Sequence, residues 1–278
     1  MKKTAQQFRQ WPNKAITLLG MSGVGKTTLS TRLPRESWFH YSGDYRIGTK
    51  YLDEPILDDI KTRVMENQSI KELLRSDSIY IRNNITIDHL HPLSCFLSKI
   101  GNPDLGGLNV DEFKRRQNLF FAAEINAMAD VREFMEKARK IYSYPHFIND
   151  AGGSICYLTD QECWNNLNEL TVVLYLRASD DMEKTLVERA GKNPKPLFYE
   201  ENFLDQHLAR YLEENNLKST DEMVPDEFVQ WVFPKLINYR KPRYERLAEK
   251  YGHTIEAEKI FKLPEDADII DLVCESMS

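Results

Sequence analysis

The chain has 278 residues, of which 41% are hydrophobic and 29% charged, a balance typical of a globular protein with a packed core. Its net charge of −6 argues against a nucleic-acid partner, because non-specific binding to nucleic acid needs a basic surface. No apolar stretch approaches the length of a membrane span, and residues 1–10 are too polar for a signal peptide. Since the four cysteines form no C-x-x-C pair, we expect reduced thiols in a cytoplasmic protein without a membrane partner.

The first predicted strand, residues 15–19, runs into a glycine-rich loop. Residues 20–27 read GMSGVGKT and satisfy the P-loop pattern G-x-x-x-x-G-K-[ST], and a helical segment follows at 28–33. Such a loop directs backbone N–H groups and a helix N-terminus at phosphate oxygens. Lys26 is expected to reach the β- and γ-phosphates, and Thr27 to complete a Mg²⁺ shell. We therefore expect ATP and Mg²⁺ to bind here, with the loop contacts coming from Gly20, Ser22, Gly23, Val24, Gly25, Lys26, Thr27 and Thr28.

A second predicted strand, residues 37–41, is followed by Asp44 and Arg46. In open α/β sheets, ligands bind beyond the carboxyl ends of the strands. A carboxylate at Asp44 can accept the proton of a hydroxyl nucleophile, and the Arg46 guanidinium can hold an anionic acceptor. The alternative is a surface turn with a solvated ion pair.

The next stretch, residues 49–144, carries many charges and no strand periodicity, with helical spacing at 70–74 and 110–142. It predicts a mostly helical insertion. His89 and His91 lack a nearby third ligand, so we expect no metal site there. Four arginines of the insertion either bind an anionic acceptor or lie on helix surfaces with their stems on the core: Arg75, Arg82, Arg115 and Arg116.

A third predicted strand, residues 145–148, leads into the sequence HFINDAGGSI. Asp150 at its end is expected to act on Mg²⁺ or on its bound waters, as the acid that follows the third strand does in P-loop proteins. Gly152 and Gly153 would let backbone amides approach a small polar ligand. The alternative is an ordinary turn, because the N-D-A-G-G composition is common in turns.

Cations follow the fourth predicted strand, residues 170–176. Arg189, Lys192 and Lys195 lie in or near a segment that we expect to act as a lid, at about 189–203. Cations on a closing lid would neutralise charge on a transferred phosphoryl group and exclude water. The alternative is a solvated helix end.

A helix is predicted at 203–214 and a fifth strand at 253–255. Strands that alternate with helical segments indicate an α/β fold: a P-loop three-layer sandwich with a parallel five-stranded sheet. The predicted core combines residues 1–48 and 145–278, and the insertion at 49–144 is expected to bind the acceptor or dock a partner.

Five segments, in the same chain order, resemble those of shikimate kinases: GMSGVGKTT, FHYSGD, INDAGGS, LYLRAS with KNPKPLF, and YRKPRYERLAEKYGHTI. The Ser-Gly-Asp of the second segment also resembles adenylate kinase, of the same broad group. The resemblance implies a kinase of the shikimate kinase or nucleoside monophosphate kinase type. It implies that Asp44 is the catalytic acid, that Gly152 and Gly153 contact the acceptor, that Lys195 touches ATP phosphates, and that Arg240 holds an acceptor carboxylate.

The sequence departs from that family at four positions. Ser42 replaces the first acid of the second-strand pair, Gly43 is inserted before Asp44, and Ser154 replaces a third glycine. At Lys195 a lysine replaces the lid arginine, which keeps the charge but loses bidentate geometry. Together with the long extra segments, these changes mean that shikimate itself is not the expected substrate.

Two functions of different class stay open. The first is a small-molecule kinase in which Lys26, Asp44 and Asp150 are catalytic and the acceptor is a small anionic or hydroxyl-bearing molecule. The second is a regulatory P-loop ATPase whose insertion docks a protein partner. A G protein is disfavoured, since no N-K-x-D-like motif follows a strand where one is expected. The sequence does not indicate an oligomeric state.

Overall fold

The computed structural model describes residues 2–264 and 268–277. The chain divides into two compact units. The first contains residues up to 43, 124–194 and from 229 onward, and the second contains 44–123 and 195–228.

The first unit contains a parallel sheet of five strands: β1 (Ala15–Leu19), β2 (Trp38–Ser42), β3 (His146–Asp150), β4 (Val172–Arg177) and β5 (Gly252–Glu256). Their order is β2-β3-β1-β4-β5, and every neighbouring pair is parallel. The connections leaving β1 and β3, which are neighbours, run to opposite sides of the sheet. The crevice beyond their carboxyl ends is therefore the switch point where α/β proteins bind ligands.

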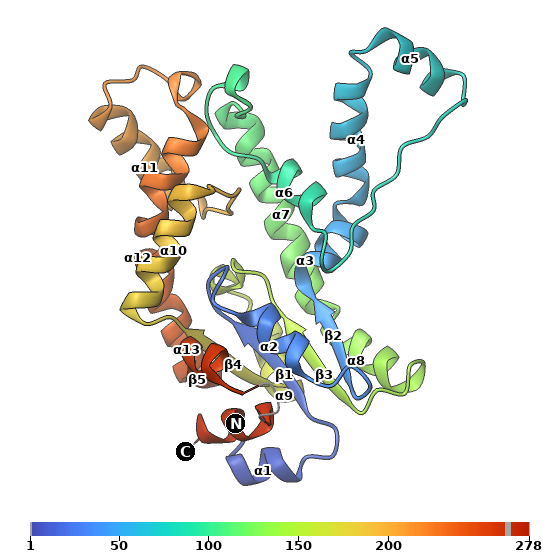
Figure 1. Ribbon diagram of the computed structural model, residues 1–278, viewed down its shortest axis with the longest axis vertical. Helices are drawn as coiled ribbons and strands as arrows, with labels where there is room; N and C mark the ends of the chain where they lie inside the picture. The colour runs from blue at the N-terminus through green and yellow to red at the C-terminus, as the bar shows by residue number, and fades with distance from the viewer. Residues whose placement is uncertain (1, 265–267, 278) are drawn as a thin grey trace. The chain divides into compact units, whose positions relative to one another are not determined.

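Helices cover both faces of this sheet (Figure 1). Tyr41 of β2 faces α8 (Val131–Lys140), because its ring centroid lies 5.1 Å from that of Phe134. Asp150 of β3 points to the opposite face and accepts a hydrogen bond from Thr27 of α2 (Lys26–Arg32). All five residues of β1 are buried, as expected for a strand covered on both faces. The predicted α/β three-layer sandwich is confirmed.

The other elements that lie wholly within the first unit are α1 (Ala5–Gln10), η3 (Ile155–Tyr157), α9 (Gln161–Leu170), α10 (Asp180–Lys192), α13 (Ala257–Lys262) and α14 (Ile269–Glu275). Two long helices run through both units: α7 (Val110–Ala129) and α12 (Pro225–Tyr251).

The second unit is mostly helical, as predicted for the insertion. It contains η1 (Ile47–Tyr51), α4 (Asp53–Val64), α5 (Gln68–Arg75), α6 (His91–Leu97), η2 (Pro103–Leu105), α11 (Glu201–Glu214) and η4 (Thr220–Glu222), with most of α3 (Gly43–Arg46) and α7. Figure 1 shows α5 at the end of α4, connected to α6 by an irregular segment.

The division into units differs from the boundaries expected from sequence, because residues 195–228 group with the insertion. Lys114 Nζ of α7 lies 3.2 Å from Glu201 Oε1 and 2.7 Å from Asp205 Oδ1 of α11. The side-chain amide of Gln117 adds to this, since Nε2 donates to Leu197 O and Oε1 accepts from Tyr199 N. These contacts join segments about eighty residues apart in sequence.

Residues 124–144, expected in the insertion, belong instead to the sheet unit. The hydroxyl of Tyr41 donates to Ala127 O, and α8 packs on the sheet beside it. The helix expected over 110–142 is divided at Asp130 into α7 and α8. All four cysteines are free thiols. Among the described residues, no helix is long and apolar enough to span a membrane.

Candidate active site

The glycine-rich loop connects the buried strand β1 to α2, in the arrangement that the motif requires. Gly20 has φ 147°, and a Cβ there would lie 2.9 Å from Leu176 O on the neighbouring strand. Gly25 has φ 100° and precedes the first residue of α2. Both positions favour glycine on conformational grounds. Ser22, Gly23, Thr27 and Thr28 are exposed while Val24 is buried, so the loop presents backbone N–H groups to a ligand.

Lys26 is the buried cation of this loop. Its side chain is folded back so that Nζ donates to Gly20 O at 2.9 Å and to Met21 O at 3.2 Å. The ammonium therefore lies over the loop backbone, where phosphate oxygens bind in P-loop proteins. A phosphate there would neutralise a charge that is only 9% exposed.

A hydroxyl and a carboxylate meet at the start of α2. Thr27 Oγ1 donates to Asp150 Oδ2 at 2.7 Å, and His40 Nε2 of β2 lies 3.6 Å from the same carboxylate oxygen. Hard oxygen ligands of this kind suit Mg²⁺, which binds through one or two protein oxygens together with phosphate oxygens and water. Among the described residues no group of three His, Cys, Asp or Glu side chains could hold a metal. The Thr27–Asp150 pair thus fits a metal that arrives with a nucleotide.

The turn after β3 is held by two side chains of α12. Arg240 Nη1 donates to Gly153 O at 2.9 Å, and the Tyr244 hydroxyl donates to the same oxygen. A Cβ on Gly153 would lie 3.5 Å from both Arg240 Nη1 and Ser22 N, so the turn packs against the P-loop. The structure therefore brings the P-loop, Asp150, the Gly152–Gly153 turn and Arg240 together within the sheet unit.

Arg240 is 3% exposed and also donates from Nε to the hydroxyl of Tyr157 at 3.0 Å. Burial raises the pKa of Tyr157 to about 12, although the nearby Arg240 charge acts in the opposite direction. Burial likewise raises the pKa of the Cys156 thiol to about 11. At neutral pH these two neighbours of Arg240 are therefore uncharged, and the guanidinium supplies the positive charge beside the turn.

Asp44 and Arg46 stand at the start of the second unit. A Cβ on Gly43, directly after β2, would lie 3.4 Å from Gly152 N. Asp44 is half-buried and is the second residue of α3. Arg46 has its guanidinium carbon 5.6 Å from the Tyr51 ring centroid. Asp44 and Arg46 follow Gly43 closely in the chain, and Gly43 belongs to the sheet unit.

The two lysines of the expected lid belong to different units. Lys192 is the exposed last residue of α10 in the first unit, and Lys195 is exposed in the second unit. Residues 193–200 between α10 and α11 have no regular secondary structure. A lid at 189–203 stays a prediction.

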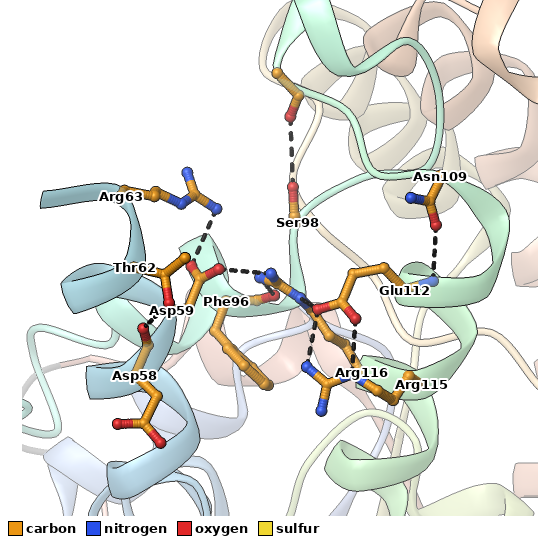
Figure 2. Close-up of polar contacts among 11 residues, drawn as sticks. Asp58, Asp59, Thr62, Arg63, Phe96, Ser98, Asn109, Glu112, Arg115 and Arg116 are labelled. Atoms are coloured by element: carbon orange, nitrogen blue, oxygen red, sulfur yellow. Dashed lines mark hydrogen bonds and ion pairs between the residues drawn. The ribbon is translucent and has the colours of Figure 1, made fainter. Parts of the chain in front are cut away.

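Two arginines offered above as acceptor ligands are occupied by carboxylates of their own unit (Figure 2). Arg116 is 4% exposed; its Nη2 lies 2.6 Å from Asp59 Oδ1 and its Nε lies 2.6 Å from Glu112 Oε1. Arg115 Nε lies 2.7 Å from Glu112 Oε2. These pairs favour the structural role for both residues. Arg75 and Arg82 are exposed.

The site also includes side chains that sequence reasoning did not select. His40 lies beside Asp150 only because β2 and β3 pair in register, and Tyr157 reaches Arg240 from a turn with no motif of its own. Tyr244 did carry a signal, since it is the tyrosine of the R-x-P-x-Y segment that begins at Arg240.

In comparisons with known proteins, no family model matches the chain, and no curated protein matches it. Among solved structures, the chain is similar to a crystal structure of shikimate kinase from Bacteroides thetaiotaomicron. The sequence identity is 13%, the match covers 95% of this chain and 94% of that chain, and the TM-score is 0.37. The assignment of the α/β fold therefore rests on the chain's own parallel sheet and glycine-rich loop.

Proposed function

We propose that the protein is an ATP-dependent phosphotransferase that transfers the γ-phosphate to a small anionic or hydroxyl-bearing acceptor. One observation carries the proposal: the glycine-rich loop, the Thr27–Asp150 pair and a turn held by Arg240 all lie at the carboxyl edge of β1 and β3. A triphosphate on the loop would have its terminal group next to that turn. The turn and Arg240 offer backbone amides and a positive charge to a second ligand.

In the proposed reaction, the acceptor hydroxyl oxygen forms a bond to the γ-phosphorus. The bond from that phosphorus to the β,γ-bridging oxygen breaks, and its electron pair leaves with ADP. The hydroxyl proton passes to the Asp44 carboxylate. Lys26 binds the β- and γ-phosphates, Thr27 and Asp150 hold Mg²⁺, and Arg240 orients the acceptor. Bound Mg²⁺ supplies charge neutralisation at the phosphates.

The second unit has a separate proposed role. It contributes Asp44, Arg46 and Lys195, three of the residues expected to contact acceptor or ATP, and the sequence of 49–144 is otherwise unlike a compact kinase core. We assign it to acceptor binding. If the second unit instead docks a protein partner, the P-loop would serve a regulatory ATPase and water would take the phosphoryl group.

A label-transfer experiment separates these outcomes. The protein is incubated with γ-³²P ATP, Mg²⁺ and a pool of small metabolites, and the products are separated by chromatography. Label on a small molecule supports the phosphotransferase. Label in free phosphate alone overturns it in favour of the ATPase.

The Lys26→Ala variant is the first prediction and tests the nucleotide site. Losing the ammonium over the loop removes the charge that stabilises the transferring phosphoryl group, so turnover should fall at least about a hundredfold. Circular dichroism should show an unchanged fold. Lys184→Ala, at an exposed position of α10, is the matched control and should keep full turnover. Normal turnover by the Lys26 variant would remove this residue from the mechanism.

A further inference from the structure

Two guanidinium groups contact one phenol ring beside the proposed acceptor turn. Arg240 and Arg243 are three residues apart on α12, so their side chains leave the same helix face. The guanidinium carbons of Arg240 and Arg243 lie 5.2 Å and 5.7 Å from the ring centroid of Tyr157. That ring belongs to the residue whose hydroxyl accepts from Arg240 Nε.

Arg243 is held in place by aromatic rings. Its guanidinium carbon lies 3.6 Å from the ring centroid of Tyr239, and Nη1 donates to Tyr239 O at 2.7 Å. The side chain is half-buried, and in the part of the chain that the structure describes it forms no ion pair with a carboxylate. Its neighbour Lys241, by contrast, lies 2.8 Å from Glu183 Oε1. Most N–H groups of the Arg243 guanidinium are thus available to an anion, and the contacts with Tyr239 fix the orientation of the guanidinium.

The position of Arg243 connects it to the acceptor turn through a short series of contacts. Tyr157 accepts from Arg240, and Arg240 donates to O of Gly153, a residue whose Cβ position lies 3.5 Å from Ser22 N of the P-loop. The electrostatic effect is also shared, since the charges of both arginines lower the pKa of Tyr157 against the larger effect of burial. Two like charges this close repel one another, and a ligand with two negative charges relieves the repulsion better than a ligand with one.

We propose that the acceptor carries a doubly negative group, either a phosphate monoester or two carboxylates, and that Arg243 is the residue that selects for the second charge. The proposal rests on the proposed function, because it names the substrate class of the same site. Arg240 would orient the ligand at the Gly152–Gly153 turn. Arg243, three residues further along α12, would bind the second negative charge.

The test measures binding by calorimetry with ADP and Mg²⁺ saturating the P-loop. The probes are two matched series of hydroxyl compounds: glycerol, glycerate and glycerol 3-phosphate, and then lactate and malate. In the wild-type protein each doubly charged member should bind at least about tenfold tighter than its singly charged counterpart, the typical gain from a charge-assisted contact. Arg243→Leu should abolish that preference while leaving ADP affinity unchanged, and Arg243→Lys should retain part of it.

Arg246→Leu is the matched control, because Arg246 is an exposed arginine one turn further along α12. It should keep the wild-type preference. Equal affinity for singly and doubly charged probes, absence of binding by every probe, or a preference that survives Arg243→Leu would overturn the proposal. Loss of ADP affinity in Arg243→Leu would also contradict it, because a structural role would then explain the result.

This experiment separates the inference from the proposed function, since calorimetry does not depend on phosphoryl transfer. If label from ATP goes only to water while binding of the doubly charged probes depends on Arg243, the phosphotransferase fails and the anion site stands. If label goes to a neutral or singly charged acceptor, the phosphotransferase stands and the inference fails.

Discussion

At the scale of single residues, the position of the Asp150 carboxylate determines which ligand it can bind. Its Oδ2 accepts from Thr27 at 2.7 Å at the start of α2, in a position suited to a metal bound with phosphate. Asp150→Asn keeps the shape of the side chain but removes its charge. Half-maximal activity should then need about tenfold more Mg²⁺, since a charge-assisted contact is lost. Asp181→Asn, at an exposed position of α10, should leave the Mg²⁺ dependence unchanged. An unaltered dependence in Asp150→Asn would count against metal binding by this residue.

Arg240 is expected to serve the acceptor and not the nucleotide. Its guanidinium donates to Gly153 O and to the Tyr157 hydroxyl, both of which belong to the segment that follows β3. Arg240→Lys, which keeps the charge in a buried position, should raise the KM for the acceptor about tenfold and leave ATP affinity unchanged. Steady-state kinetics and nucleotide titration measure the two quantities separately. An equal loss of ATP affinity would show that the assignment is wrong.

At the scale of elements, α12 contains prolines at 234 and 242 within its 27 residues. Pro242 lies between Arg240 and Arg243 and cannot donate a backbone hydrogen bond, which weakens the helix at that turn. Pro242→Ala should raise the free energy of unfolding by about 1–3 kcal/mol. It should also raise the acceptor KM several-fold, because the path of the helix sets the spacing of the two arginines.

Pro234→Ala, in the same helix, should stabilise the protein without this effect on the acceptor. Thermal unfolding and acceptor kinetics on both variants test the prediction. The same acceptor KM in Pro242→Ala and wild type would mean that the proline does not set the geometry of the site.

The elements also show what the sequence can and cannot predict. The strand at 15–19 is confirmed residue for residue, because a buried apolar run before a P-loop leaves little freedom. The last strand is one residue longer than 253–255 at each end, since Gly252 pairs with Val173 and Glu256 pairs with Arg177. His40 and Tyr157 could not be predicted as neighbours of the site, because strand pairing and a turn without a motif bring them there.

At the scale of the whole molecule, low pH should destabilise the second unit by protonating Glu112. The hydrogen bond from Arg115 lowers the pKa of this carboxyl from 4.5 to about 2 against the opposing effect of burial, with Arg116 adding to the lowering (Figure 2). A lowered pKa stabilises the fold above 4.5, and this stabilisation is lost as the pH falls from 4.5 towards 2.

Glu112→Gln should therefore lower the free energy of unfolding at pH 7 by on the order of 1 kcal/mol, after allowance for partial exposure. It should also flatten the dependence of stability on pH between pH 5 and pH 2. Denaturant titrations across this range measure both effects. Glu66→Gln, at an exposed position of the same unit, should behave as the wild type. An equally steep pH dependence in Glu112→Gln would exclude this carboxyl as its source.

The chain passes between the units four times, and two of these passages lie inside α7 and α12. The irregular segment 193–200 holds another, so a protease that cuts there severs the backbone between α10 and α11. Ion pairs from Lys114 to Glu201 and Asp205 still tie the newly freed end to α7. The two fragments should therefore migrate as one particle on a sizing column and separate only on a denaturing gel.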